Sequence, residues 1–386
     1  MTPNNINLKP PQFVNQQSVF EKILRDIGGE KTLAIDTEAN SLYAYREQVC
    51  LIQISCSKKD YIIDPLALED LSPLGDIFSN PGIEKIFHAS EYDILIMYDE
   101  YQFSFQNLFD TMLAAQILGR KKLGLDALLE EIVGIQVNKK YQRANWGKRP
   151  LSDDMLQYAQ MDTHYLIKIR HTLAVELEQK GLNPIAAEDF SRACRVHRQD
   201  REEKLAPYWR INGARKLPPQ KAAVLVKLFE YRDQVAQKIH QPVFKVLSSQ
   251  TLLNLAEQCP TSAQQLLKLE LVGKNALRRH SEGLVKAIKT GLASDPVRPP
   301  RRERTDDSFF AREKALRDWR KKTAQKMHVN SAVVLPRELL YALVSTNPAN
   351  KEELAKVLAD VPWRLERFGE DILSILTKDS ISRSAE

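Results

Sequence analysis

Short apolar runs separated by polar breaks dominate the first third of the chain and are typical of β-strands. Buried strands are predicted over 31–37, 48–56, 60–64 and 84–88, with a shorter one over 107–110. The brief polar breaks between the first three favour an antiparallel meander. A helix is predicted near 91–100, and helical patterns dominate after 110. Strands followed by alternating strands and helices predict an α/β domain with a mixed central sheet.

From about residue 206 the strand pattern disappears, and two helical segments repeat each other at an offset of 88 residues. The repeat needs no gaps: Ala236-Gln237-Lys238 matches Ala324-Gln325-Lys326, and Pro260 matches Pro348. An ungapped match of this length indicates two copies of one small all-α domain. Two copies joined by a linker form a tandem pair, because a solenoid needs at least three stacked repeats.

Proline-rich segments mark the expected domain boundaries. We predict an α/β domain over 1–205, a first helical domain over 206–293 and a second over 308–386. The intervening segment 294–307 is basic and rich in proline, which is typical of an extended linker. A chain of 386 residues is long enough for such a three-domain arrangement.

Composition narrows the class of protein. Hydrophobic residues make up 43% and charged residues 27%, as in ordinary globular chains. The four cysteines form no CxxC pair, so neither a zinc site nor a disulfide framework is expected, which fits a reducing cytoplasm. No apolar run approaches the ~18 residues that span a bilayer. We therefore expect a cytoplasmic protein without a membrane partner, and a monomer.

The net charge of +6 conceals a difference between the two halves. Residues 1–205 carry 24 Lys and Arg against 30 Asp and Glu, whereas residues 206–386 carry 32 against 20. An acidic half joined to a basic half fits a metal-binding catalytic domain attached to a domain that binds a polyanion. Basic helices that are merely solvated would give the same counts, so both interpretations stay open.

Acidic residues with a possible chemical role occur in three separated segments. Asp36 and Glu38 lie two apart on a predicted strand, which puts both side chains on one face. Asp93 lies at a predicted helix start, where Ser90 and Asp93 also resemble a capping box. Tyr158 and Asp162 share one helix face through their i, i+4 spacing. Each signal has an ordinary structural alternative when it is taken singly.

Taken together, these segments suggest one anionic pocket. Several carboxylates in one pocket repel one another unless a cation is bound, and hard oxygen ligands favour Mg²⁺ or Mn²⁺. Two such ions can clamp a phosphodiester, so the first hypothesis is a metal-dependent nuclease. Three basic residues just upstream of the last motif either grip a nucleic-acid backbone or belong to a solvated loop: Arg143, Lys148 and Arg149.

The order Asp-x-Glu, Asp, Tyr-x-x-x-Asp resembles the DEDD exonucleases of the ribonuclease-H-like superfamily. The tyrosine subgroup is indicated, because Gln157 stands where the other subgroup has histidine. Three further features resemble the ribonuclease D family: Asp110-Thr111-Met112-Leu113-Ala114-Ala115, Trp146-x-x-Arg149-Pro150-Leu151 and the helical repeat. The repeats resemble the HRDC domain that RecQ-type helicases share with ribonuclease D.

This resemblance implies a ribonuclease-H-like α/β catalytic domain followed by two HRDC-like domains. It also implies 3′→5′ hydrolysis of RNA to nucleoside 5′-monophosphates, with tRNA precursors and other small structured RNAs as substrates. Two Mg²⁺ or Mn²⁺ ions would be held by four acids: Asp36, Glu38, Asp93 and Asp162. Asp36 would bridge both ions, Asp93 would hold the waters of the second, and Tyr158 would orient the attacking water.

Two alternatives from other classes remain at this point. A DNA exonuclease of the same superfamily would use the same metal site, because selection of RNA depends on contacts to the 2′-hydroxyl that the sequence does not expose. A non-catalytic nucleic-acid-binding protein with a relic nuclease fold is disfavoured, since all four acids and the tyrosine are present.

Overall fold

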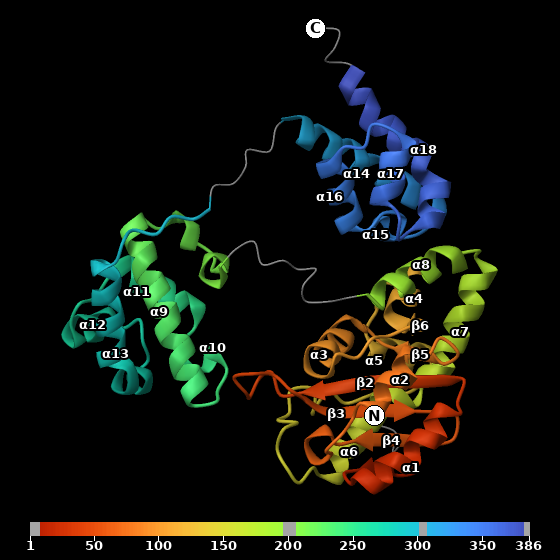
Figure 1. Cartoon of the computed structure of the whole chain (residues 1–386), viewed down its shortest axis with the longest axis horizontal. Helices are drawn as coiled ribbons and strands as arrows, with labels where there is room; N and C mark the ends of the chain where they lie inside the picture. Colours follow the sequence, from red (N-terminus) through yellow and green to blue (C-terminus); the bar gives the residue numbers. More distant parts are fainter. Residues whose placement is uncertain (1–7, 196–205, 301–306, 382–386) are drawn as a thin grey trace. The chain divides into compact units, whose positions relative to one another are not determined.

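The computed structural model of the chain describes residues 8–195, 206–300 and 307–381 (Figure 1). The described residues form two compact units. One contains the described parts of 1–38, 49–198 and 304–386, and the other contains 39–48 and the described parts of 199–303. The expected boundary near 205 and much of the expected linker lie outside the described residues, while 294–300 has neither helix nor strand. In the described ranges no helix is long and apolar enough to cross a membrane.

A six-stranded sheet forms the core of the first unit, in the order β1-β4-β3-β2-β5-β6. Its strands are β1 Gln12–Val14, β2 Thr32–Ala39, β3 Val49–Ser55, β4 Asp60–Ile63, β5 Glu84–Phe87 and β6 Leu108–Asp110. The predicted mixed sheet is confirmed, because β3 and β4 pair antiparallel whereas β1–β4, β2–β5 and β5–β6 pair parallel. Sequence reasoning missed β1, a three-residue strand with one fully buried side chain.

Helices pack around this sheet and bury its central strands. They are α1 Gln17–Gly28, α2 Pro73–Ser79, α3 Glu91–Tyr101, α4 Thr111–Ile117, α5 Leu125–Leu128, α6 Asp153–His164, α7 Leu166–Gln179 and α8 Asn183–Ala193, with short turns η1 Pro65–Ala67 and η2 Leu129–Val133. All seven residues of β3 are buried, as expected of a strand covered on both faces. The predicted helix near 91–100 corresponds to α3.

The two helical domains repeat each other in structure as they do in sequence. The first has η4 Pro207–Arg210, η5 Ala214–Lys216, α9 Pro219–Lys238, α10 Val243–Val246, α11 Ser249–Gln258, α12 Ala263–Leu269 and α13 Lys274–Ala293. The second has α14 Asp307–Met327, α15 Ser331–Val334, α16 Arg337–Thr346, α17 Lys351–Val357 and α18 Pro362–Ile381. Four of the five helix pairs keep the 88-residue offset at both ends.

Each copy is held together by an equivalent internal arginine. Arg232 is 3% exposed and donates to the carbonyl oxygen of Leu247 at 3.3 Å. Arg320, at the matching position, donates to the carbonyl oxygen of Leu335 at 2.9 Å. The same interaction at the same offset shows that the two copies share side-chain contacts as well as the order of their helices.

The loop that precedes α6 is fixed by Arg149. Its guanidinium donates twice to the Asp64 carboxylate, at 2.7 Å each, and to the carbonyl oxygens of Cys50 and Trp146 at 2.9 and 2.6 Å. Asp64 is 2% exposed. These contacts give Arg149 a structural role in this loop, and its contact with RNA stays a prediction.

Replacing Arg149 by alanine is expected to destabilise the protein by about 3–5 kcal/mol, because it leaves the Asp64 carboxylate buried without its partner. Urea denaturation of both proteins measures the change. Lys148→Ala, at an exposed neighbouring position, is the control and should stay within about 0.5 kcal/mol of wild type. A loss below 1 kcal/mol in Arg149→Ala would show that this ion pair is not a structural anchor.

Candidate active site

One cavity collects most of the residues that the sequence singled out. Asp36 and Glu38 lie near the end of β2, and both line a cavity of about 340 Å³. Tyr158 and Asp162 line the same cavity from α6. A strand and a helix separated by more than 100 residues therefore supply one site, as their spacing on shared faces predicts.

Asp93 is tied to this site through Thr37, the residue between the two acids of β2. The backbone amide of Thr37 donates to the Asp93 carboxylate at 3.1 Å, and the Thr37 hydroxyl donates to the same oxygen. Asp93 is 6% exposed. The Ser90 side chain makes no capping hydrogen bond to α3, so the alternative role of these residues as a capping box is not realised.

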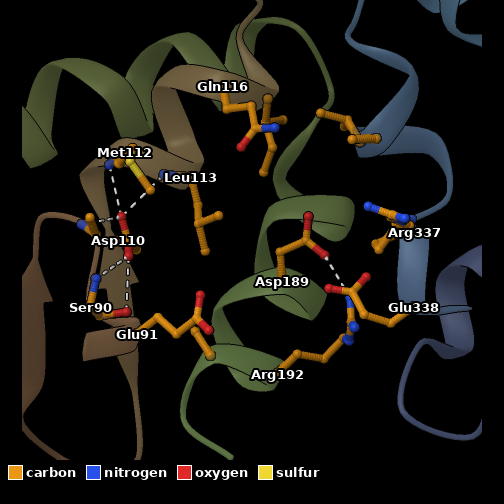
Figure 2. A pocket seen from close by; sticks show the side chains of 16 residues that line it. Ser90, Glu91, Asp110, Met112, Leu113, Gln116, Asp189, Arg192, Arg337 and Glu338 are labelled. Atoms are coloured by element: carbon orange, nitrogen blue, oxygen red, sulfur yellow. Dashed lines mark hydrogen bonds and ion pairs between the residues drawn. The ribbon is translucent and has the colours of Figure 1, made fainter. Parts of the chain in front are cut away.

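Asp110 holds the turn that leads to Asp93 (Figure 2). Its carboxylate accepts from the backbone amides of Ala89 and Ser90 at 3.1 and 2.8 Å, and from the Ser90 hydroxyl at 2.9 Å. It also accepts from the amides of Met112 and Leu113 at the start of α4, at 2.8 and 3.1 Å. Ala89 has φ of 63°, a left-handed conformation that costs a residue with a Cβ free energy. Three hydrogen bonds therefore hold this turn, and two more tie the same carboxylate to the start of α4.

A second polar cluster anchors α6 to the sheet. The Asp60 carboxylate, at the start of β4, accepts from the Gln160 amide at 2.6 Å and contacts His164 Nδ1 at 2.8 Å. The hydroxyls of Ser55 and Thr163 are 2.7 Å apart. Because these contacts come from the face of α6 that packs on β3 and β4, they set the position from which Tyr158 and Asp162 reach the cavity.

Burial raises the pKa of all four candidate ligands, and repulsion from neighbouring acids adds to it. The pKa of Asp36 is raised well above its ordinary value, first by burial and then by the charges of Asp93, Asp162 and Glu38. Burial, with the same neighbours, raises the pKa of Glu38 to about 9. The pKa values of Asp93 and Asp162 rise to about 7, mainly through burial. The four carboxylates thus interact strongly enough to oppose one another's ionisation.

Tyr158 is placed to act as a neutral phenol. Burial and the charges of Asp162, Glu38 and Asp36 raise its pKa above the ordinary value near 10. Its ring packs against Trp146 and Tyr141, with centroid distances of 6.1 and 6.0 Å. The tryptophan of the sequence motif therefore has a structural role, which is to fix the ring whose hydroxyl enters the site.

The donor set fits a hard divalent cation. Four carboxylates with raised pKa values gain from a positive charge among them, and oxygen-only ligands favour Mg²⁺ or Mn²⁺. In the described ranges, no group of three or more His, Cys, Asp or Glu side chains is spaced so that it could hold a metal ion as it stands. The fit therefore rests on the chemistry and burial of the donors.

The structure adds residues that the sequence did not indicate. His88 lines the cavity, its Nδ1 lies 3.0 Å from the Thr111 hydroxyl, and burial lowers its pKa, which favours the neutral ring. Lys139 and Gln142, from the segment between η2 and α6, also line the cavity. No spacing rule pointed to them, because their position depends on how this irregular segment folds. Arg143 and Lys148 are exposed in the same segment.

Family models match three regions of the chain. Residues 11–178 match a 3′-5′ exonuclease domain. Residues 221–288 and 309–376 each match the HRDC domain, at the 88-residue offset seen in the sequence.

Among curated proteins, the chain is 30% identical to the exosome complex exonuclease RRP6 of Saccharomyces cerevisiae, over 73% of this chain and 40% of the yeast protein. It spans 35% and 48% of two RRP6-like proteins of Arabidopsis thaliana, so it covers less than half the length of these relatives. It is 27% identical to ribonuclease D of Nitrobacter hamburgensis, over 89% of both chains.

Solved structures show the same fold. The crystal structure of Escherichia coli RNase D has 24% identity and a TM-score of 0.72, covering 96% of this chain and 99% of that one. The catalytic core of RRP6 from Trypanosoma brucei has 25% identity and a TM-score of 0.65, covering 76% and 82%.

Asp36→Asn is expected to stabilise the metal-free protein by about 1–3 kcal/mol, because it removes one of several repelling buried charges. Mg²⁺ should stabilise the wild type, by about 2.7 kcal/mol at 100 times its dissociation constant, and should have little effect on the variant. Thermal melts with EDTA and with Mg²⁺ measure both effects. Equal responses of the two proteins to Mg²⁺ would contradict the assignment of Asp36 as a ligand.

Proposed function

Because this chain is a homologue of ribonuclease D that joins a 3′-5′ exonuclease domain to two HRDC domains, we propose that it is a 3′→5′ exoribonuclease releasing nucleoside 5′-monophosphates. The observation that carries the proposal is the single cavity at the end of β2. Asp36, Glu38 and Asp162 line it together with the neutral phenol of Tyr158, and Asp93 is hydrogen-bonded to Thr37 in its wall. Acidic groups gathered away from water are unfavourable without a cation. Divalent cations bound by such groups catalyse the hydrolysis of phosphodiesters.

Each acid has a role in binding two divalent cations. Asp36, Glu38 and Asp162 would hold the ion on the side of the attacking water, and Asp36 would also contribute to holding the second. Asp93, fixed by Thr37, would hold the waters of that second ion. Bound Mg²⁺ or Mn²⁺ supplies charge that lowers the pKa of water and stabilises the developing charge on the phosphate.

Tyr158 orients the attacking water by hydrogen bonding. Its raised pKa keeps the phenol protonated at neutral pH, so the hydroxyl positions the water and does not remove its proton. Trp146 and Tyr141 limit rotation of the ring, which reduces the entropy lost when the water, the hydroxyl and the phosphate align.

The substrates we propose are tRNA precursors and other small structured RNAs. Escherichia coli RNase D, which shares the fold, is described as an exoribonuclease involved in structured RNA processing. The excess of basic residues after position 206 fits an RNA partner. DNA hydrolysis is the second candidate, because metal-dependent cleavage does not itself use the 2′-hydroxyl. A monomer in the cytoplasm remains our prediction.

The protein should release nucleoside 5′-monophosphates one at a time from the 3′ end of a tRNA precursor that carries a short 3′ trailer, in the presence of Mg²⁺. Chromatography of the products from 5′-labelled and 3′-labelled RNA tests direction and product together, with DNA of the same sequence as the comparison. Asp36→Asn should show no turnover. Comparable activity of wild type and Asp36→Asn would disprove the assignment of this cavity as the active site.

Tyr158→Phe should lower kcat about 10²–10⁴-fold, which is the range for one group that positions a reacting water. Its Mn²⁺ affinity should stay near that of wild type, because the hydroxyl is not a ligand. Single-turnover hydrolysis and calorimetric titration measure the two quantities separately. An unchanged rate would make Tyr158 a packing residue.

A further inference from the structure

Arg364 joins the second helical domain to the catalytic domain. It lies in the first turn of α18 and is 0% exposed. Its guanidinium donates to the carboxylates of Glu188 and Asp189 on α8, at 2.8 and 2.9 Å. It also donates to the carbonyl oxygens of Val333 and Val334 in its own domain, at 2.8 and 3.3 Å. A buried charge with this many partners fixes the two surfaces on each other, because breaking one pairing leaves the rest uncompensated.

Glu188 also caps the start of α18. Its carboxylate accepts from the backbone amide of Trp363 and, at 3.2 Å, from that of Arg364. The first amides of a helix have no partner within the helix, and negative charge is favoured at that end. Glu188 is 7% exposed, so α8 completes a helix of the second copy inside a largely dry contact.

The first copy lacks the residues that make this contact. The 88-residue offset places Ala276 at the position of Arg364 and Asn275 at that of Trp363. An alanine has no donor to offer a pair of carboxylates. The repeat therefore offers a comparison within one chain. The second copy has the arginine that binds α8, and the first copy has alanine at that position.

The two copies also differ in net charge, and here the first copy has the feature that the second lacks. Residues 219–293 of the first copy hold 11 Lys and Arg against five Asp and Glu, whereas residues 307–381 of the second hold 13 against 11. The two copies thus differ by four charges at equal length. The first copy, at +6 against +2, has the larger excess of the positive charge that attracts a phosphate backbone.

Half of this difference lies where the last helix begins: residues 274–279 carry a net charge of +3 and residues 362–367 carry +1. Three basic side chains, all exposed, occupy the first turns of α13: Lys274, Arg278 and Arg279. The corresponding residues of the second copy are Pro362, Glu366 and Arg367.

The second copy also faces the loop that leads to Asp93. Pro336, Arg337 and Glu338, at the start of α16, line a cavity of about 400 Å³ together with Ala89–Glu91 and residues of α8 (Figure 2). This face of the second copy is therefore turned toward the catalytic domain.

We propose that the two helical copies have divided their tasks, an inference that rests on the proposed RNA substrate. Arg364 makes the second copy a fixed part of the catalytic unit. The first copy binds the phosphate backbone of the RNA through the basic start of α13. The shared fold has diverged at equivalent positions, toward a protein partner in one copy and toward a polyanion in the other.

RNA binding tests the first copy. Full-length Asp36→Asn protein, which should not degrade RNA, carries either K274A/R278A/R279A or the charge-matched K351A/K356A/R367A in the second copy. The first triple variant should bind a tRNA precursor at least about tenfold more weakly and lower the salt slope by about 2, as expected for three lost phosphate contacts. The matched variant should stay within about twofold of its parent. Equal losses in both, or a loss only in the matched variant, would overturn the division.

Hydrogen exchange tests the second copy. In the same background, Glu188→Ala leaves the sequence of the second copy intact, and Arg364→Ala removes the partner from the other side. Both should speed exchange of the amides at the start of α18 at least tenfold, while the buried core amides near Leu343 stay slow and RNA affinity stays within twofold. Unchanged exchange in both variants would overturn the proposal. So would a more than twofold fall in RNA affinity when the contact with α8 is lost. Neither measurement depends on hydrolysis. A protein that cleaves only DNA would therefore contradict the proposed function without deciding the outcome of these two tests.

Discussion

The repulsion among four buried or half-buried carboxylates is the constraint on which the rest of the catalytic unit depends. Burial raises the pKa of Asp36, Glu38, Asp93 and Asp162, and neighbouring negative charge raises it further, so nothing in their own interactions draws them together. The surrounding protein must hold them against that repulsion. Such sites lower the stability of the metal-free fold and gain it back when a cation binds.

Three sets of polar contacts provide this support, and none of them enters the proposed chemistry. Asp110 fixes the turn before α3 with three hydrogen bonds and caps the start of α4 with two more. Asp60 anchors α6 through Gln160 and His164. Arg149 closes the loop before α6 on Asp64. Each set centres on a buried or half-buried carboxylate that accepts several hydrogen bonds. Such networks are rigid when their polar groups have hydrogen-bond partners.

The helical repeats show how a duplicated fold acquires a second use through few residues. Arg232 and Arg320 preserve the same internal contact in both copies, so the packing of the domain is unchanged. Arg364 and Ala276 differ at one equivalent surface position. A single buried arginine converts a surface that would otherwise face water into one that requires acidic partners.

The sequence determined the elements and the candidate chemistry, because both depend on local spacing. Periodicity gave five of the six strands, the 88-residue offset gave both helical domains, and shared faces paired Asp36 with Glu38 and Tyr158 with Asp162. Tertiary structure alone decided three matters: Arg149 binds Asp64, Thr37 holds Asp93, and the second helical copy joins the catalytic unit. These outcomes depend on residues 56 to 176 positions apart, and no local pattern encodes which distant partners a buried charge will meet.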